Sequence, residues 1–324
     1  MANRKYSVIL GNLGNTCDRF CSGYKENPKT LDMLQQAVNI PEVKGVELVG
    51  TWDIHEKNVR EMKTAFTDHD IVCVSIIPDL FANKLYGSGS YTSRDPKIRQ
   101  YAMDYTRRLC DIAMEMNCKT INLWPGQDGY DYLLTSNYMQ AREHLYDAVV
   151  TLAREYPYLD FALEYKPKEP RTHSYVARMA DSLLLALETE CSNVGITIDT
   201  GHAFNAGEVV AESIVLAKRY GNKLMHMHFN DNYTAWDDDM IVGSVHTTCY
   251  LEILYWLDEC GYDGWLSMDQ YPYREDAASA ISESIQWLMA FDRMLDANRD
   301  KIRAVIENGS AVEVSALMRF LITG

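Results

Sequence analysis

The chain has 324 residues, of which 47% are hydrophobic and 24% charged, a composition typical of globular proteins with a large core. Its formal net charge of −15 argues against a nucleic-acid or anionic-membrane partner, because both need a basic surface. No apolar run is long enough to span a membrane, and the first residues lack the apolar core of a signal peptide. We therefore expect a cytoplasmic protein that binds neither nucleic acid nor membrane.

The eight cysteines fit this expectation. Several of them fall in predicted strands or helices, so we expect most of the eight to be reduced core residues of a cytoplasmic protein. Cys17 and Cys21 are the only close pair, and their spacing is not that of a zinc knuckle. We expect no structural zinc site.

Short apolar runs alternate with segments of helical period along the chain, in units of about forty residues. The predicted strands are 6–11, 45–49, 72–77, 119–124, 160–165, 194–199, 223–229 and 264–269. The predicted helices are 30–39, 56–67, 96–117, 137–156, 174–188, 207–220, 247–260 and 277–297. Eight alternating pairs are typical of an α/β protein built as a single (β/α)₈ TIM barrel.

We expect this barrel to occupy residues 1–298, and residues 299–324 to form a short C-terminal helical tail. A doubly wound parallel sheet is the alternative architecture. The loop after the first strand lacks the glycine-rich dinucleotide motif of such sheets, which argues mildly against it.

Strands five to eight of this barrel end near Glu164, Asp199, His228 and Asp269. Active sites of such barrels lie at the carboxyl ends of the strands. A single acidic residue there is more often a solvated loop residue, but four ligand-type residues in succession are difficult to explain in that way. Three carboxylates and one imidazole can surround one divalent cation, and we expect these four to do so. His226, deeper on the same strand, is expected to be a buried, hydrogen-bonded histidine.

A second set of ligand types lies nearby in the sequence. His202 follows Asp199 by three residues. Asp237 and Asp239 are two residues apart in the loop after His228, in an acidic run that directly follows Trp236. These residues predict a second, more open metal site, with Asp199 as a bridge; the alternative is an acidic surface loop. Imidazole mixed with carboxylates favours Mn²⁺ or Co²⁺, and Mg²⁺ is also compatible.

Lys166 follows Glu164 by two residues and so lies on the same side of the strand line. Its ammonium can donate a hydrogen bond to a substrate oxygen, or it can serve only as a salt-bridge partner. Trp124, Trp52 and Phe20 are candidates for an aromatic wall that packs against the apolar face of a sugar. For each aromatic residue, core packing explains the sequence equally well.

The residues above, taken together, resemble the xylose isomerase-like TIM-barrel superfamily from about residue 10 to residue 290. LEYKPKEP at 163–170 is similar to the family's segment around a metal-binding glutamate and a catalytic lysine. LWPGQDGY at 123–130 is similar to its tryptophan-containing motif on strand four. NYTAWDDD at 232–239 resembles its second-metal loop, and YTSRDP at 91–96 has a counterpart before the third helix.

The metal-ligand pattern suggests a branch of that superfamily. Asp199 and His228 resemble the rhamnose isomerase branch and the ketose 3-epimerases, whereas xylose isomerase has glutamate and aspartate there. The epimerases typically have a glutamate on strand eight, where this chain has Asp269, and lack counterparts of Asp237 and Asp239. The resemblance therefore implies an aldose–ketose isomerase of the rhamnose isomerase type.

The implied reaction moves a hydrogen between C2 and C1 of a sugar, by hydride shift or through an enediol. We expect a free, unphosphorylated sugar, because the sequence shows no basic cluster of the kind that binds a phosphate. We expect two divalent ions, with Mn²⁺ favoured by the ligand types. We also expect a homo-oligomer, either a dimer or a tetramer, but the family's tetramer cannot be assumed because its long C-terminal arm is mostly missing here. The catalytic residues implied are Lys166, His202, Asp237, Asp239 and Glu164. The second strand ends in Val49, where xylose isomerase has the histidine linked to ring opening, so xylose itself is in doubt. The alternatives are a ketose 3-epimerase with Glu164 as the base, and a sugar or inositol lyase or deglycosidase of the same superfamily.

Overall fold

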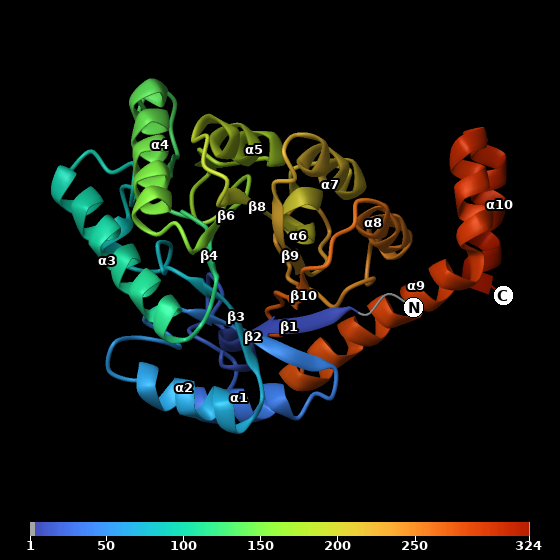
Figure 1. Ribbon diagram of the computed structural model, residues 1–324, viewed down its shortest axis with the longest axis horizontal. Helices are drawn as coiled ribbons and strands as arrows, with labels where there is room; N and C mark the ends of the chain where they lie inside the picture. Colours follow the sequence, from blue (N-terminus) through green and yellow to red (C-terminus); the bar gives the residue numbers. More distant parts are fainter. Residues whose placement is uncertain (1–3, 324) are drawn as a thin grey trace.

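Eight parallel strands form a closed barrel in the computed structural model, which describes residues 4–323 (Figure 1). Their order around the barrel is β1-β10-β9-β8-β6-β4-β3-β2. The strands are β1 (Lys5–Ile9), β2 (Val43–Val49), β3 (Val72–Ile77), β4 (Thr120–Leu123), β6 (Asp160–Glu164), β8 (Val194–Asp199), β9 (Leu224–Phe229) and β10 (Trp265–Met268). The predicted TIM barrel is thus confirmed.

Helices surround the barrel and follow its strands in the chain (Figure 1). They are α1 (Thr30–Val38), α2 (Val59–Asp68), α3 (Pro96–Glu115), α4 (Tyr138–Glu155), α5 (Met179–Glu188), α7 (Val210–Arg219), α8 (Thr247–Glu259) and α9 (Ala277–Asn308). The start of α3 shows how local chemistry sets a boundary. Pro96 occupies its first turn, and the Asp95 carboxylate accepts the Lys97 N–H at 2.8 Å, which satisfies a free backbone donor.

Four short elements lie in segments predicted as loops, as the end of a strand or as the start of a helix. Two are 3₁₀ turns, η1 (Leu10–Leu13) and η2 (Lys84–Tyr86). Two are short strands, β5 (Gly129–Tyr130) and β7 (His173–Ser174), which pair in an antiparallel way and join the loops after β4 and β6. The predicted helix 174–188 therefore begins later, at Met179. A fifth element, α6 (Thr200–Asn205), follows β8 directly and is the one that matters for the site.

The predicted helical tail at the C-terminal end of the chain is confirmed. The helix predicted at 277–297 continues to Asn308, and the helix α10 (Ala311–Thr323) follows and packs on α9 through the buried Leu317 and Leu321. The end of α9 and α10 extend away from the barrel (Figure 1). The proposed division at 298/299 falls inside α9, so the tail is continuous with the last helix of the barrel. Residues 1–3 and 324 lie outside the described range.

The inside of the barrel is unusually polar below the site. Barrels of this class are usually filled with branched apolar side chains. Here the fully buried polar residues on the strands include Ser7, Glu47, Ser75, Asn122, Thr197, His226, His228 and Ser267. Hydrogen bonds between strands that are not neighbours cross the interior, for example Thr197 Oγ1 on β8 to Asn122 Oδ1 on β4 at 2.5 Å. This polar interior supports the groups at the strand ends.

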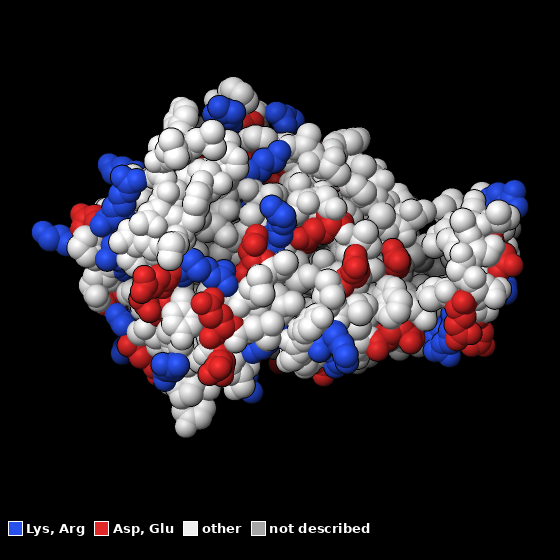
Figure 2. Space-filling view, turned by 90° about the horizontal axis from the view of Figure 1, so that it is seen from above, with Lys and Arg blue, Asp and Glu red and all other residues white. Residues whose placement is uncertain are grey.

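The cysteines, the surface charge and the helix lengths bear on the expected environment of the protein. All eight cysteines are free thiols, but only Cys73, Cys110 and Cys118 are buried, fewer than expected. On the face shown in Figure 2, Lys and Arg side chains are interspersed with Asp and Glu and do not gather into one basic patch. Among the described residues 4–323, no helix has both the length and the apolar character needed to cross a bilayer.

A buried ion pair ties the start of the chain to the outer helices. The Arg4 guanidinium, just before β1, lies 2.8 Å from Asp258 on α8 and 2.9 Å from Asp292 on α9. The Arg4 side chain is only 5% exposed. Loss of Arg4 would leave Asp292 buried without its counter-charge, which is costly because water cannot replace the arginine there.

We therefore expect Arg4→Ala to lower the free energy of unfolding by about 3–5 kcal/mol, measured by urea denaturation. Arg142 is a matched control, because it pairs with Glu188 at 2.9 Å on the surface, where the two side chains are 35% and 49% exposed. Arg142→Ala should cost about 1 kcal/mol or less. Equal losses from the two substitutions would contradict the role given to Arg4.

Candidate metal centre

The four ligand-type residues predicted at the strand ends come together in the structure. One ligand atom from each of Glu164, Asp199, His228 and Asp269 lies within 4.8 Å of the others. Nδ1 of His228 is 3.4 Å from Oε1 of Glu164 and 3.3 Å from Oδ2 of Asp269. Three of the side chains are buried, and that of Asp269 is 15% exposed. We call these four residues the cage.

The donors of the cage fit a divalent cation. His228 Nδ1 is buried and has no hydrogen-bond partner among the described residues, whereas its Nε2 faces the carboxylate of Glu47 at 3.3 Å. A buried imidazole nitrogen normally makes a hydrogen bond. A nitrogen that makes none, and that faces carboxylate oxygens, is suited to bind a metal ion together with them. One imidazole with three carboxylates suits Mn²⁺ and related ions.

Electrostatics also favour a cation in the cage. Burial and the neighbouring carboxylates Asp237, Asp269 and Glu164 together raise the pKa of Asp199 to about 6, although His202 opposes this. Burial would raise the pKa of Glu164 as well, but His228 and His202 outweigh it and hold that pKa well below its ordinary value. Carboxylates this close and this dry repel one another unless positive charge lies among them.

Buried asparagines fix the orientation of the three carboxylates. The bonds run from Asn122 Nδ2 to Glu164 Oε2 (2.6 Å), from Asn230 Nδ2 to Asp199 Oδ2 (2.9 Å) and from Asn12 Nδ2 to Asp269 Oδ1 (3.0 Å). For Glu164 and Asp269, the other oxygen is the one that faces His228. A neutral amide can orient a carboxylate without neutralising it, so each oxygen that faces the cage keeps its charge.

The second predicted set is assembled only in part. His202 Nε2 lies 3.1 Å from Oδ2 of Asp237, and His202 Nδ1 lies 3.2 Å from Oε1 of Glu164. Asp239 is half-buried. Within the described part of the chain, His202, Asp237 and Asp239 do not form a group with ligand atoms all within 4.8 Å. His202 therefore lies between the cage and Asp237.

The short helix α6 places His202. Asp199 is its N-cap residue, and Oδ1 of Asp199 accepts the His202 backbone N–H at 2.8 Å. A carboxylate at this position satisfies a free backbone donor and interacts favourably with the helix dipole. The same residue thus contributes one carboxylate to the cage and sets the position of His202 beside it.

Lys166 lies beside the residues of the second set and contributes a positive charge there. Its Nζ is 2.7 Å from Oδ2 of Asp237 and 3.4 Å from Glu169, and it lies 5.1 Å from the ring centre of Trp124. Burial would lower the pKa of Lys166, but Asp237, Asp239 and Glu169 outweigh burial and raise it. Lys166 is therefore a buried ammonium at neutral pH that shares Asp237 with His202.

Of the three predicted aromatic residues, Trp52 and Trp124 lie in one row of rings, whereas Phe20 lies apart from them. The rings of Trp52 and Phe81 are 5.5 Å apart, those of Phe81 and Trp124 are 4.5 Å apart, and Trp124 is 6.3 Å from the His202 ring. This aromatic row runs from the second set towards the outside, where Trp52 is 42% exposed. Phe20 instead lines a cleft of about 510 Å³, together with Trp236, Asp237, Asp239 and Tyr271, among others. Its side chain is 91% exposed.

Sequence reasoning missed the asparagines and Glu47. Their signal was present, because Glu47 and Asn122 interrupt strands whose other residues are mostly apolar. A buried parallel strand normally reads as a continuous apolar run, so a polar residue within one indicates a specific partner. His226 was expected to be buried and hydrogen-bonded, and its Nε2 lies 2.8 Å from Glu47 Oε1.

Comparisons with known proteins agree with this geometry. Residues 34–291 match the family described as xylose isomerase-like TIM barrel. Xylose isomerases of Thermus thermophilus and Thermus caldophilus are 27% and 26% identical to this chain over 243 and 242 residues. Each match covers 72% of this chain but only 60% of the relative, so the chain spans about three fifths of the length of these proteins.

Solved structures show the same fold. An L-ribulose 3-epimerase superposes with a TM-score of 0.71 at 11% identity, covering 93% of this chain and 98% of that one. A D-tagatose 3-epimerase-like protein superposes with a TM-score of 0.68 at 20% identity, covering 90% and 99%. The family match includes every barrel strand from β2 to β10 and all four cage residues. The chain therefore belongs to the xylose isomerase-like TIM-barrel family.

Proposed function

We propose that the protein is a metal-dependent sugar isomerase that interconverts a free aldose and its ketose. The observation that carries the proposal is the cage, in which the unpaired Nδ1 of His228 faces carboxylates at a barrel mouth. The buried ammonium of Lys166 beside it supplies a donor for a substrate oxygen. The relatives named as xylose isomerases support this class of reaction.

Glu164, Asp199, His228 and Asp269 would hold a divalent cation, with Mn²⁺ favoured by the donor set. Such a cation, when bound, stabilises negative charge on adjacent sugar oxygens. His202, Asp237 and Asp239 would hold a second ion. Because Lys166 and His202 already contact Asp237 Oδ2, this second ion would be bound less tightly than the ion in the cage.

The remaining steps belong to the chain's own side chains. Lys166 would hydrogen-bond the sugar O1 and stabilise charge that develops there as hydrogen moves between C2 and C1. Asp237 keeps Lys166 charged and holds it in place. Trp124, with Phe81 and Trp52 behind it, would pack against the apolar face of the sugar and exclude water.

A ketose 3-epimerase is the second candidate. The observation that favours it is the incomplete second set, because the cage alone would serve a reaction that needs one ion. Glu164 would then be the base that removes the proton from C3. The structural neighbours named as epimerases show the fold and do not decide between the two reactions.

The reaction is tested in D₂O on a panel of free aldoses and ketoses, with protein that has been reloaded with Mn²⁺. For the NMR spectra the Mn²⁺ is exchanged for Mg²⁺. We expect interconversion of an aldose with its ketose, and its loss after treatment with a chelator. Any deuterium should enter at C1 or C2. Deuterium at C3 with no aldose formed would favour the epimerase, and no turnover of any free sugar would contradict both.

Lys166→Ala should lower kcat by about 10²-fold or more, since a donor to a developing charge is lost. Stopped assays with the converted aldose measure this effect, and thermal unfolding shows whether the variant is folded. Lys119→Ala is the matched control, because Lys119 is an exposed lysine at the opposite end of the barrel, just before β4. An unchanged kcat in a folded Lys166→Ala variant would reduce Lys166 to a structural ion pair.

We also propose that the protein is a cytoplasmic homo-oligomer, a dimer or a tetramer. Phe20 at the cleft and the apolar side of α10, where Val312 is 80% and Phe320 48% exposed, are the proposed contact surfaces. Light scattering on the purified protein should give a mass of two or four chains, and the mass of a single chain would contradict it.

A further inference from the structure

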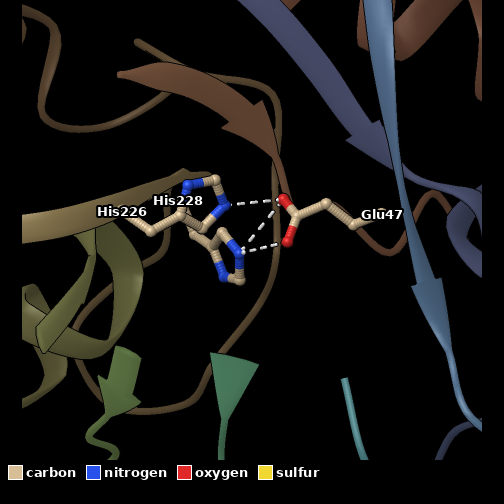
Figure 3. Close-up of side chains that lie close together, drawn as sticks. All are labelled: Glu47, His226 and His228. Atoms are coloured by element: carbon tan, nitrogen blue, oxygen red, sulfur yellow. Dashed lines mark hydrogen bonds and ion pairs between the residues drawn. The ribbon is translucent and has the colours of Figure 1, made fainter. Parts of the chain in front are cut away.

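Glu47 lies inside the barrel beneath the cage. It is on β2, its side chain is fully buried, and two imidazoles from β9 point at its carboxylate (Figure 3). His226 Nε2 is 2.8 Å from Oε1, and His228 Nε2 is 3.3 Å from Oε2. The hydroxyl of Ser75 on β3 also donates to Oε2. Glu47 therefore joins three strands through hydrogen bonds.

This contact determines which nitrogen of His228 carries the proton. An ionised carboxylate only accepts hydrogen bonds, so each ring nitrogen that faces it must be a donor. Neutral His228 with its proton on Nε2 keeps its lone pair on Nδ1. Nδ1 is the atom that faces Glu164 and Asp269 and has no hydrogen-bond partner.

We propose that Glu47 is a positioning residue for the metal centre, which fixes His228 with its Nδ1 lone pair towards the cage. His226 in turn holds Glu47, since it binds the carboxylate oxygen that Ser75 leaves free. A carboxylate behind a metal-binding histidine sets the tautomer and ring orientation and makes the imidazole a stronger ligand. The inference rests on the proposed metal site and is independent of the sugar reaction.

A different use of the same residues is conceivable from distance alone. Glu47, His226 and His228 also have ligand atoms within 4.8 Å of one another, so they could form a separate ion site. The hydrogen bonds favour positioning, because the two Nε2 atoms and the Ser75 hydroxyl are already directed at the carboxylate oxygens. In a separate site, an ion would replace the Nε2 proton of His228.

The first test is Mn²⁺ affinity of metal-stripped protein, measured by electron paramagnetic resonance without any sugar. Glu47→Gln has the same shape but is neutral, so the negative charge behind His228 is lost. Only one of its two terminal atoms is an acceptor, so the hydrogen bonds that Oε1 and Oε2 of Glu47 now accept cannot all be kept. We expect the Kd for Mn²⁺ to rise about 10–100-fold. An unchanged Kd in a folded Glu47→Gln variant would overturn the proposal.

Asp128→Asn is the matched control. Asp128, in the loop after β4, is another buried carboxylate, 1% exposed. It accepts hydrogen bonds from the backbone N–H groups of Ser90 and Thr92 in the loop after β3. Its loss should lower stability without changing Mn²⁺ affinity. A rise in Kd as large as that in Glu47→Gln would show that general destabilisation explains the effect, and would overturn the positioning role.

The second test uses the unmodified protein, so folding of a variant does not matter. With ¹⁵N-labelled histidine and Zn²⁺ as a diamagnetic probe, long-range ¹H–¹⁵N spectra should show the His228 proton on Nε2 and a metal-shifted Nδ1. A metal-shifted Nε2 would overturn the proposal in favour of a separate ion site. If the wild-type protein bound neither Mn²⁺ nor Zn²⁺, the proposed metal centre would fail together with the inference. Metal binding without turnover of any sugar would contradict the proposed isomerase reaction but not the positioning role of Glu47.

Discussion

The burial of negative charge inside a closed barrel is the constraint on which the site depends. The cage carboxylates Glu164 and Asp199 are almost completely removed from water, and Glu47 lies beneath them with no exposure at all. Water cannot stabilise these charges, so protein groups or a bound cation must do so. The polar interior follows from this need, because asparagines, serines and imidazoles occupy positions where other barrels of this class carry branched apolar residues.

The same constraint links the cage to the residues beside it. Asp199 contributes a carboxylate to the cage and also caps α6, which carries His202. His202 then contacts Glu164 on one side and Asp237 on the other, and Asp237 holds the ammonium of Lys166. Carboxylates and nitrogen-bearing side chains therefore alternate from the cage to Lys166. In the proposed reaction, a change of charge at the sugar would interact with side chains whose ion pairs and orientation are already fixed.

Much of the fold was predictable from the sequence because strands and helices have different periods. The bounds of β3 and β8 were predicted to the residue, and the strand ends then placed the cage residues on neighbouring strands. The helix α6 was missed because six residues are too few for a helical period to appear. The β5–β7 pair was missed because its partners are far apart in the sequence.

The supporting residues were missed for a different reason. Glu47 meets His226 only because the barrel closes and brings β2 opposite β9, and no local pattern contains that contact. The same is true of Asn12, which reaches Asp269 from the other end of the chain. Polar residues inside apolar strands mark such positions, although the partner becomes evident only from the closed barrel.

Anomalous X-ray scattering at the manganese edge, from crystals grown with Mn²⁺, shows directly whether the cage binds a metal ion. We expect a strong peak among Glu164, Asp199, His228 and Asp269, close to Nδ1 of the histidine. We also expect a weaker peak beside Asp237 and Asp239. Crystals that contain Mn²⁺ but give no peak within the cage would contradict the proposed metal centre.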